Sequence, residues 1–128
     1  MFGKVERASV LSATGSVLAL WCTGAERPLR LLSGDYYRLD VWEIAPELRG
    51  GAFGALTFSL IAARASELGC DGIVLGAMPG TEGVYLKLGG RKELVFGWKT
   101  NSSLIPFLFD KKALTYLTEQ ADDHLDEG

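Results

Sequence analysis

The chain has 128 residues, of which 48% are hydrophobic and 23% charged, enough apolar material for the core of one domain. Its formal net charge at pH 7 is -3, and five acidic residues lie within residues 119–128, which contain no lysine or arginine. Without that tail the net charge changes from -3 to +2, so the body is mildly basic. This balance suits an anionic ligand but lacks the basic density expected of a nucleic-acid binder.

Cysteine and histidine are too few for several kinds of site. Cys22 and Cys70 are isolated, and His124 is the only histidine in the sequence. A Cys/His zinc site and a histidine-based catalytic triad are therefore excluded, and no metal is expected. Isolated cysteines usually behave as small, buried hydrophobic residues. Unpaired thiols also indicate a reducing compartment, which predicts a cytoplasmic protein.

The N-terminal residues superficially resemble a signal peptide, because Lys4 and Arg7 precede an apolar run. However, Glu6 lies within the basic region, and polar residues between 12 and 16 interrupt the run. Cleavage would also remove an expected core strand, so export is not predicted. No stretch approaches the ~20 apolar residues that span a membrane, so no membrane association is predicted.

The first part of the chain predicts short strands. These are residues 4–11, 16–22 and, less clearly patterned, 29–32. Residues 33–35 read as a hairpin turn. Residues 36–45 are predicted as one central strand, which ends at Pro46 because proline cannot donate a hydrogen bond to a ladder.

A glycine-rich loop follows this strand, with Arg49, Gly50, Gly51 and Gly54 ahead of a predicted helix at about residues 50–68. Glycines allow close approach of the backbone to a ligand. A helix N-terminus has free N–H groups that attract anions, and Arg49 adds a positive charge. The loop therefore predicts a phosphate-binding site; the alternative is a tight turn between strand and helix.

Two better-known phosphate-binding motifs do not fit this loop. A P-loop requires Gly-x-x-x-x-Gly-Lys-Ser/Thr, and no lysine follows these glycines. A dinucleotide fingerprint requires Gly-x-Gly-x-x-Gly and an acidic residue about 20 positions further on. Gly50, Gly51 and Gly54 have a different spacing, and Asp71 would begin the next strand. Neither motif is assigned.

The predicted helix is apolar nearly all round, which indicates burial on more than one face or a partner surface. Gly69 is a candidate C′ cap, and residues 71–77 read as a fully buried strand. Strand, helix and strand in this spacing predict a right-handed βαβ crossover with parallel strands.

The second half of the chain predicts a short helix over residues 81–88, with Thr81 as its N-cap. Residues 91–98 and 104–109 are predicted as two antiparallel strands, and Pro106 places the second at an edge or a bulge. A terminal helix follows; Asp110 is expected to cap it, from Lys111 to about Asp122.

Two motifs in this order resemble those of the GNAT acetyltransferase superfamily. Residues 46–54 (PELRGGAFG) resemble its acyl-CoA loop, Arg/Gln-x-x-Gly-x-Gly/Ala; Arg49 and Gly54 match, and Ala52 replaces the first glycine. Residues 85–89 (YLKLG) resemble the Tyr-x-Lys-x-Gly-Phe helix and lie at the expected distance beyond the loop.

Two departures from the superfamily pattern accompany this resemblance. Gly90 replaces an aromatic residue, and only 34 residues precede Asp35, too few for the two usual N-terminal helices. The resemblance implies a single α+β domain over residues 1–128 with a twisted mixed sheet. Its parts are the shortened N-terminal strands (1–34), the acyl-CoA-binding core (36–109), and the terminal helix with the acidic tail (110–128).

The resemblance further implies an N-acetyltransferase that uses acetyl-CoA, or a related acyl-CoA, as co-substrate and an amine as acceptor. A backbone N–H near Ile44 would stabilise the oxyanion, and Tyr85 would protonate the departing thiolate. Glu43 and Asp40 are candidate bases, and they differ in parity along the strand. The implied acyl-CoA-binding residues are Glu43, Ile44, Ala45, Arg49, Gly50, Gly51, Ala52, Phe53, Gly54, Tyr85 and Lys87.

Simpler roles remain open for these residues. Tyr85 is alternatively a packing residue, and Trp42 either lines an acceptor pocket or packs in the core. The whole chain is alternatively a catalytically weak acyl-CoA-binding or protein-interaction module, because its N-terminal region is short and no base is obvious.

The missing helices also bear on assembly. Their absence predicts open apolar surface on residues 17–21 or on the 52–68 helix, and hence a homodimer, with Leu114 and Leu117 as candidate contacts. In the alternative, residues 29–32 and the N-terminal strands cover the gap and the chain is a monomer.

Overall fold

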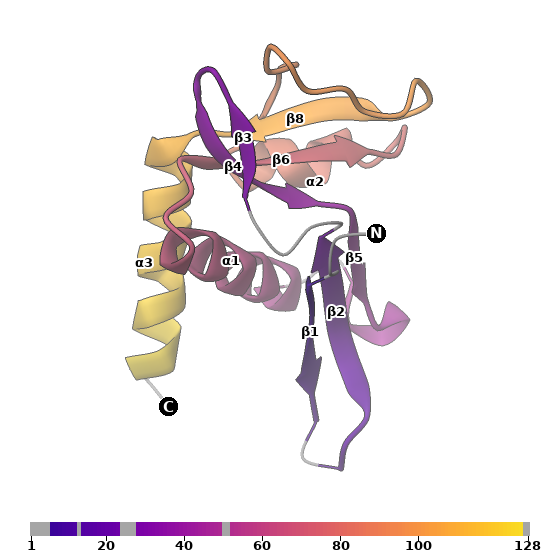
Figure 1. Ribbon diagram of the computed structural model, residues 1–128. Coiled ribbons are helices and arrows are strands. Elements are labelled where there is room, and N and C mark those ends of the chain that lie inside the picture. The colour runs from indigo at the N-terminus through magenta and orange to yellow at the C-terminus, as the bar shows by residue number, and fades with distance from the viewer. Residues whose placement is uncertain (1–5, 13, 24–27, 50–51, 127–128) are drawn as a thin grey trace.

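The computed structural model describes residues 6–12, 14–23, 28–49 and 52–126, which form two β-sheets packed against helices (Figure 1). One sheet is antiparallel, in the order β1-β2-β5. Its strands are β1 (Glu6–Leu11), β2 (Val17–Thr23) and β5 (Val41–Ile44). The other is mixed, in the order β3-β4-β6-β8-β7. Its strands are β3 (Leu29–Leu31), β4 (Gly34–Leu39), β6 (Gly72–Ala77), β7 (Arg91–Lys92) and β8 (Ile105–Phe109).

The helices confirm the predicted order of elements. They are the 3-10 turn η1 (Pro46–Leu48), α1 (Ala52–Glu67), α2 (Glu82–Lys87) and α3 (Lys111–Asp126). The βαβ unit is β4–α1–β6, and β4 pairs with β6 in parallel from Tyr36↔Gly72 to Leu39↔Leu75. The expected α+β architecture with a mixed sheet is therefore present.

The predicted continuous strand 36–45 is wrong in one respect, because it breaks at Asp40 into β4 and β5. Up to Leu39 the chain pairs with β6, and from Val41 it pairs with β2 instead. Leu39 and Trp42 both pack into the core on the helix side, so the two residues between them interrupt the strand alternation. Figure 1 shows β5 turning away from the five-stranded sheet toward β2.

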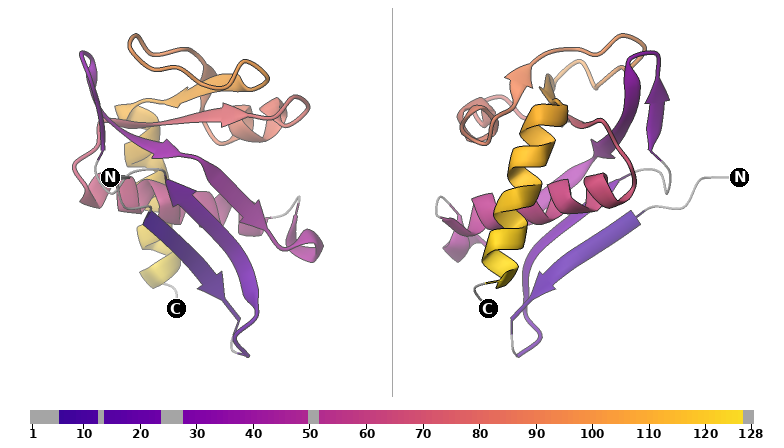
Figure 2. Two further views of the ribbon diagram at one scale, coloured as in Figure 1. Left: turned by 45° about the vertical axis from the view of Figure 1, so that its right-hand side comes forward. Right: turned by 90° about the vertical axis from the view of Figure 1, so that its left-hand side faces the viewer.

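The main core lies between the five-stranded sheet and the helices. Its fully buried members include Tyr37, Phe58, Ile73 and Phe107, and α1 crosses α3 beneath the sheet (Figure 2). The structure describes α1 throughout, and none of its large apolar side chains is exposed. Burial on more than one face, by sheet and α3, explains why this helix is apolar nearly all round.

This packing corrects the predicted dimer contacts. Leu114 and Leu117 are 0% and 4% exposed in the core, so they are not available to a partner. Along the predicted strip of residues 17–21, Val17 is exposed, whereas Ala19 and Trp21 are buried. The homodimer itself stays a prediction.

The predicted strand 91–98 is also wrong, because only Arg91 and Lys92 pair with β8. Gly97 has a φ of +91°, and the Trp98 N–H donates to the Val95 carbonyl at 3.0 Å, which makes a turn. This turn places Val95 and Trp98 against the sheet face opposite the helices. Residues 93–104 are therefore a loop that covers that face.

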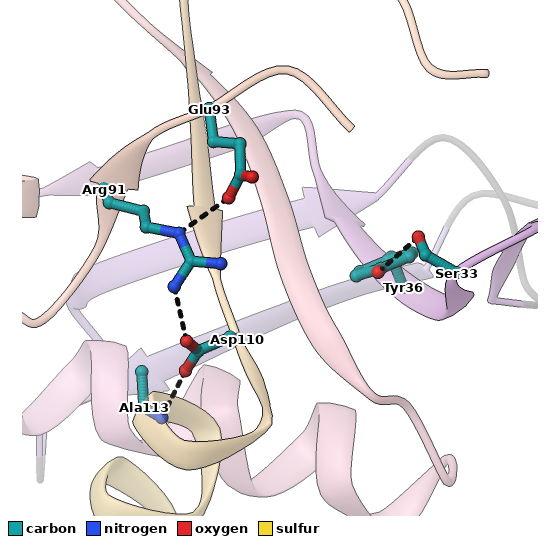
Figure 3. A network of polar contacts seen from close by, with 6 residues as sticks. All are labelled: Ser33, Tyr36, Arg91, Glu93, Asp110 and Ala113. Atoms are coloured by element: carbon teal, nitrogen blue, oxygen red, sulfur yellow. Dashed lines mark hydrogen bonds and ion pairs between the residues drawn. The ribbon is translucent and has the colours of Figure 1, made fainter. Parts of the chain in front are cut away.

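Hydrogen bonds fix the start of α3 as the sequence predicts. The Ala113 N–H donates to Asp110 Oδ1 at 3.0 Å, and Arg91 bridges Asp110 and Glu93, each at 2.6 Å (Figure 3). The Ala113 N–H, and then Arg91, lower the pKa of Asp110. The helix extends to Asp126, beyond the predicted Asp122.

Thr81 occupies the N-cap position of α2, but it does not cap the helix with its side chain. Its hydroxyl instead donates to the Met78 carbonyl at 2.6 Å. Among the described helices, none is both long and apolar enough to cross a membrane.

Candidate functional site

The break at Asp40 opens the sheet at one point. Leu39↔Leu75 is the last pair between β4 and β6. Beyond it, β6 continues beside β8 as far as Ala77, while β5 continues beside β2. The facing edges of β5 and β6 therefore diverge, and the two sheet faces on either side of this divergence carry different side chains.

The helix side of the divergence is aromatic. The ring centroid of Trp42 lies 5.1 Å from that of Phe58 and 6.0 Å from that of Tyr85, and Tyr85 lies 5.6 Å from Phe107. Burial in this setting raises the pKa of Tyr85 above its ordinary value. Among the described residues the Tyr85 hydroxyl has no hydrogen-bond partner. Tyr85 is thus a protonated phenol whose donor is available to a ligand.

The opposite side of the divergence holds a polar cavity of about 250 Å³. Arg38 and Asp40 line it, joined by an ion pair at 3.1 Å and a second contact at 3.3 Å. The 93–104 loop forms one wall of it, and lies so close that a Cβ at Gly76 would overlap the Thr100 hydroxyl. The full lining is Arg38, Leu39, Asp40, Gly76, Trp98, Lys99, Thr100, Asn101 and Leu104.

Both candidate bases lie on this polar side. Asp40 lines the cavity. Glu43 is exposed and lies between Trp42 and Ile44, which face the helices, so its side chain points to the opposite face. In a regular strand Asp40 and Glu43, three residues apart, would face opposite sides of the sheet, as the sequence predicted. The break at Asp40 shifts the alternation of side chains by one residue, so both lie on the same face.

The glycine-rich loop is described only in part, since Gly50 and Gly51 lie outside the described residues. Arg49 is exposed, and its Nε donates to the Ile44 carbonyl at 2.9 Å, which ties the loop to the end of β5. Ala52 is exposed and Phe53 half-buried at the start of α1. Ala45, Glu47 and Leu48 connect β5 to this loop through η1.

Gly54 lies in the first turn of α1, and a Cβ there would meet only Ile44 Cδ1 at 3.4 Å, an ordinary contact. Glycine inside a helix costs about 1 kcal/mol relative to alanine. None of the described residues therefore requires glycine at this position.

Two further residues of the second motif occupy α2 and its end. Lys87 is exposed in the last turn of α2. Gly90, where the superfamily pattern has an aromatic residue, is buried, and a Cβ there would lie 2.6 Å from Phe109 Cζ. The ring of Phe109, from β8, therefore fills the space beside this glycine.

The cavity residues Arg38, Trp98 and Thr100 were not identified from the sequence. Trp98 and Thr100 lie in or beside a segment that reads as a strand, and the turn at Gly97 is the one local signal that would have marked it as a loop. Within the described residues, no group of three or more His, Cys, Asp or Glu side chains could hold a metal ion.

Comparison with known proteins supports the resemblance at the level of the fold. No family model matches the sequence, and no curated protein matches it. Tetrahymena Gcn5 aligns with a TM-score of 0.68 at 12% identity, over 83% of this chain and 68% of that chain. The spermidine/spermine N-acetyltransferase SpeG from Vibrio cholerae aligns at 0.61 and 16% identity, over 89% and 71%.

A GNAT-family acetyltransferase from Listeria monocytogenes aligns with a TM-score of 0.57 at 11% identity, over 82% of this chain and 64% of that chain. These neighbours confirm the fold expected from the two motifs. The chain has the fold of the GNAT acetyltransferases.

Proposed function

We propose that this protein transfers an acyl group from acetyl-CoA, or a related acyl-CoA, to an amine by direct attack. The observation that carries the proposal is the divergence of β5 from β6 beside the protonated Tyr85. An extended ligand rich in amide groups can pair with an open strand edge as an added strand.

The backbone of β5 supports this placement of the pantetheine arm. The Ile44 carbonyl accepts from Arg49, which indicates that it points away from the ladder with β2. In an antiparallel ladder the N–H of a residue points the same way as its carbonyl. The Ile44 N–H is then available to the thioester oxygen, and Glu43 and Ala45 flank the arm.

The start of α1 is the proposed site of the CoA pyrophosphate. Gly54 leaves room for it, and the N–H groups of Gly50 to Phe53 would bind its oxygens at the positive end of the helix. Within the described residues the two Nη groups of Arg49 make no hydrogen bond, so they can reach a phosphate. Lys87, exposed on α2, is the second cation.

In the proposed reaction, the amine nitrogen attacks the thioester carbon, the new C–N bond forms, and the C–S bond breaks with its electron pair on sulfur. Tyr85 protonates that thiolate. The proton lost by the amine passes to Glu43, or to Asp40 in the adjacent cavity. The acceptor binds in the Arg38–Asp40 cavity as the neutral amine, because Arg38 and Lys99 outnumber the one carboxylate of the lining, and Asp40 can accept a hydrogen bond from it. We expect the reaction to be cytoplasmic.

Calorimetry with acetyl-CoA tests the binding step. Wild-type protein should bind acetyl-CoA, and adenosine without phosphates far more weakly. Gly54→Asp should weaken binding by about 10²-fold or more, because it puts a like charge against the pyrophosphate. Gly83→Asp, at an exposed glycine of α2 with nothing within 4 Å of its added Cβ, is the control and should bind normally.

If Gly54→Asp binds as well as wild type, the phosphate site is misassigned. Release of free thiol in the presence of a panel of amines then tests the transfer. Tight binding without thiol release would instead favour the acyl-CoA-binding module.

A further inference from the structure

Two buried donors near the site have no hydrogen-bond partner among the described residues, Arg38 Nε and Trp42 Nε1, but Arg38 Nε still lies 3.1 Å from Asp40 in their ion pair. Trp42 Nε1 is fully buried, and no described residue accepts a hydrogen bond from it. The indole, which is partly buried as a whole, packs against the rings of Phe58 and Tyr85 on the helix side of the divergence. An unpaired buried N–H opposes folding, because it loses its bond to water and gains none.

The tryptophan directly opposite on β2 behaves differently. Trp21 pairs with Trp42 across the antiparallel ladder, and its Nε1 donates to the Tyr37 hydroxyl at 3.3 Å inside the core. Phenylalanine at position 42 would supply the same aromatic contacts to Phe58 and Tyr85 without a buried donor. The N–H of Trp42 therefore implies an acceptor outside the described residues.

If the proposed function is correct, the position of the indole indicates which ligand atom accepts its hydrogen bond. Tyr85, the proposed donor to the thiolate, is the ring next to Trp42, so the sulfur of a bound acyl-CoA lies at this point. The acyl carbonyl is bonded to the same carbon as that sulfur. We propose that Trp42 Nε1 donates a hydrogen bond to the thioester carbonyl oxygen of the bound acyl-CoA.

This contact makes Trp42 a catalytic residue. When the amine attacks, the electron pair of the C=O bond moves onto the oxygen, and it returns as the C–S bond breaks. A hydrogen bond to a charged oxygen is stronger than one to a neutral carbonyl, so the indole stabilises the transition state more than the bound substrate. It acts together with the backbone N–H of Ile44.

The substitution Trp42→Phe removes the donor and keeps an aromatic ring. We expect the affinity for acetyl-CoA to fall by about 3- to 10-fold, the contribution of one neutral hydrogen bond. The affinity for free CoA, which has no acyl carbonyl, should not change. The turnover number should fall by about 10²-fold, as for loss of one oxyanion donor.

Trp21→Phe is the matched control, because it removes an internal hydrogen bond from the neighbouring strand. It should lower the temperature of thermal unfolding more than Trp42→Phe does, and leave both ligand affinities unchanged. Should Trp42→Phe fail to fold, benzothienylalanine at position 42 has the shape of tryptophan with sulfur in place of N–H, and the same results are expected.

Equal binding of acetyl-CoA by wild type and the variant, with equal turnover, would overturn the assignment of Trp42. Equal weakening of acetyl-CoA and free CoA would also overturn it, because the donor would then contact the pantetheine arm instead. Failure of the wild-type protein to bind either ligand is a different result, which rejects the proposed function itself.

Discussion

The two faces of the sheet at the break after β4 differ in almost every property. On the helix face, Trp42, Phe58 and Tyr85 pack together, and burial raises the pKa of the phenol. On the other face, Arg38 and Asp40 form a half-exposed ion pair in a polar cavity. Burial favours a neutral group that must keep its proton, whereas charged groups are tolerated in the polar, half-exposed setting. One strand break thus separates the proposed acid, Tyr85, from the proposed bases, Asp40 and Glu43, by the thickness of a sheet.

The largest expected effect comes from removing the proposed acid, Tyr85, on the helix face. Tyr85→Phe keeps the ring contacts, so the protein should fold, while the turnover number falls by about 10²-fold or more. Because burial raises the pKa of Tyr85, its protonated form persists above the pH at which free tyrosine ionises. Loss of turnover through deprotonation of Tyr85 should therefore begin only above about pH 10. Steady-state kinetics across pH measure both effects, and an unchanged rate in a folded variant would remove Tyr85 from the mechanism.

A second substitution disturbs the packing beneath the same face without touching its polar groups. Gly90→Ala places a methyl group 2.6 Å from Phe109 Cζ, and Phe109 packs on Phe58 with ring centroids 4.7 Å apart. We expect the free energy of unfolding to fall by about 1–3 kcal/mol, as for other overpacked cores. Urea denaturation measures this change.

Gly83→Ala is the control for the stability measurement, because a Cβ there meets nothing within 4 Å and alanine favours a helix by about 1 kcal/mol. It should be neutral or stabilising. If Gly90→Ala is as stable as Gly83→Ala, the space beside Phe109 is larger than the structure indicates.

The smallest expected effect tests the polar face. Asp40→Asn should raise the KM for the amine by about 10-fold, the loss of one charge-assisted hydrogen bond, and leave acetyl-CoA affinity unchanged. Glu67→Gln, which breaks the exposed Arg64–Glu67 ion pair on α1, is the control and should change neither. A lower acetyl-CoA affinity in Asp40→Asn would show that the two faces are not separate sites.

The sequence predicts most of the fold because the local signals are strong. Helix α1, the buried strand β6 and the cap at Asp110 follow from apolar runs, glycines and a capping residue. The break at Asp40 was missed because both halves of residues 36–45 favour a strand. The sequence does carry one sign of the break, a shift in which alternate residues face the helices. Before Asp40 these are the odd-numbered Tyr37 and Leu39, and after it the even-numbered Trp42 and Ile44.

The candidate site was predicted less completely than the fold. Two local motifs identified the loop before α1 and Tyr85, and their roles stay predictions. The polar cavity depends on the 93–104 loop lying against Arg38 and Gly76, which are distant in sequence. Leu94 and Phe96 look like strand residues, yet they are 56% and 79% exposed because the turn at Gly97 directs Val95 and Trp98 inward instead. Such long-range contacts leave no local pattern.

The open edge of β5 has a consequence for self-association. An unpaired strand edge is a template for any extended chain, including another copy of the same protein. The protein limits this risk through length and chemistry: β5 has four residues, it carries Glu43, and Pro46 lies two residues beyond its end. Arg49 also donates a hydrogen bond to the carbonyl of Ile44, the last residue of the strand. The edge is therefore too short to propagate a fibril, and it still matches the short, amide-bearing arm that we propose binds there.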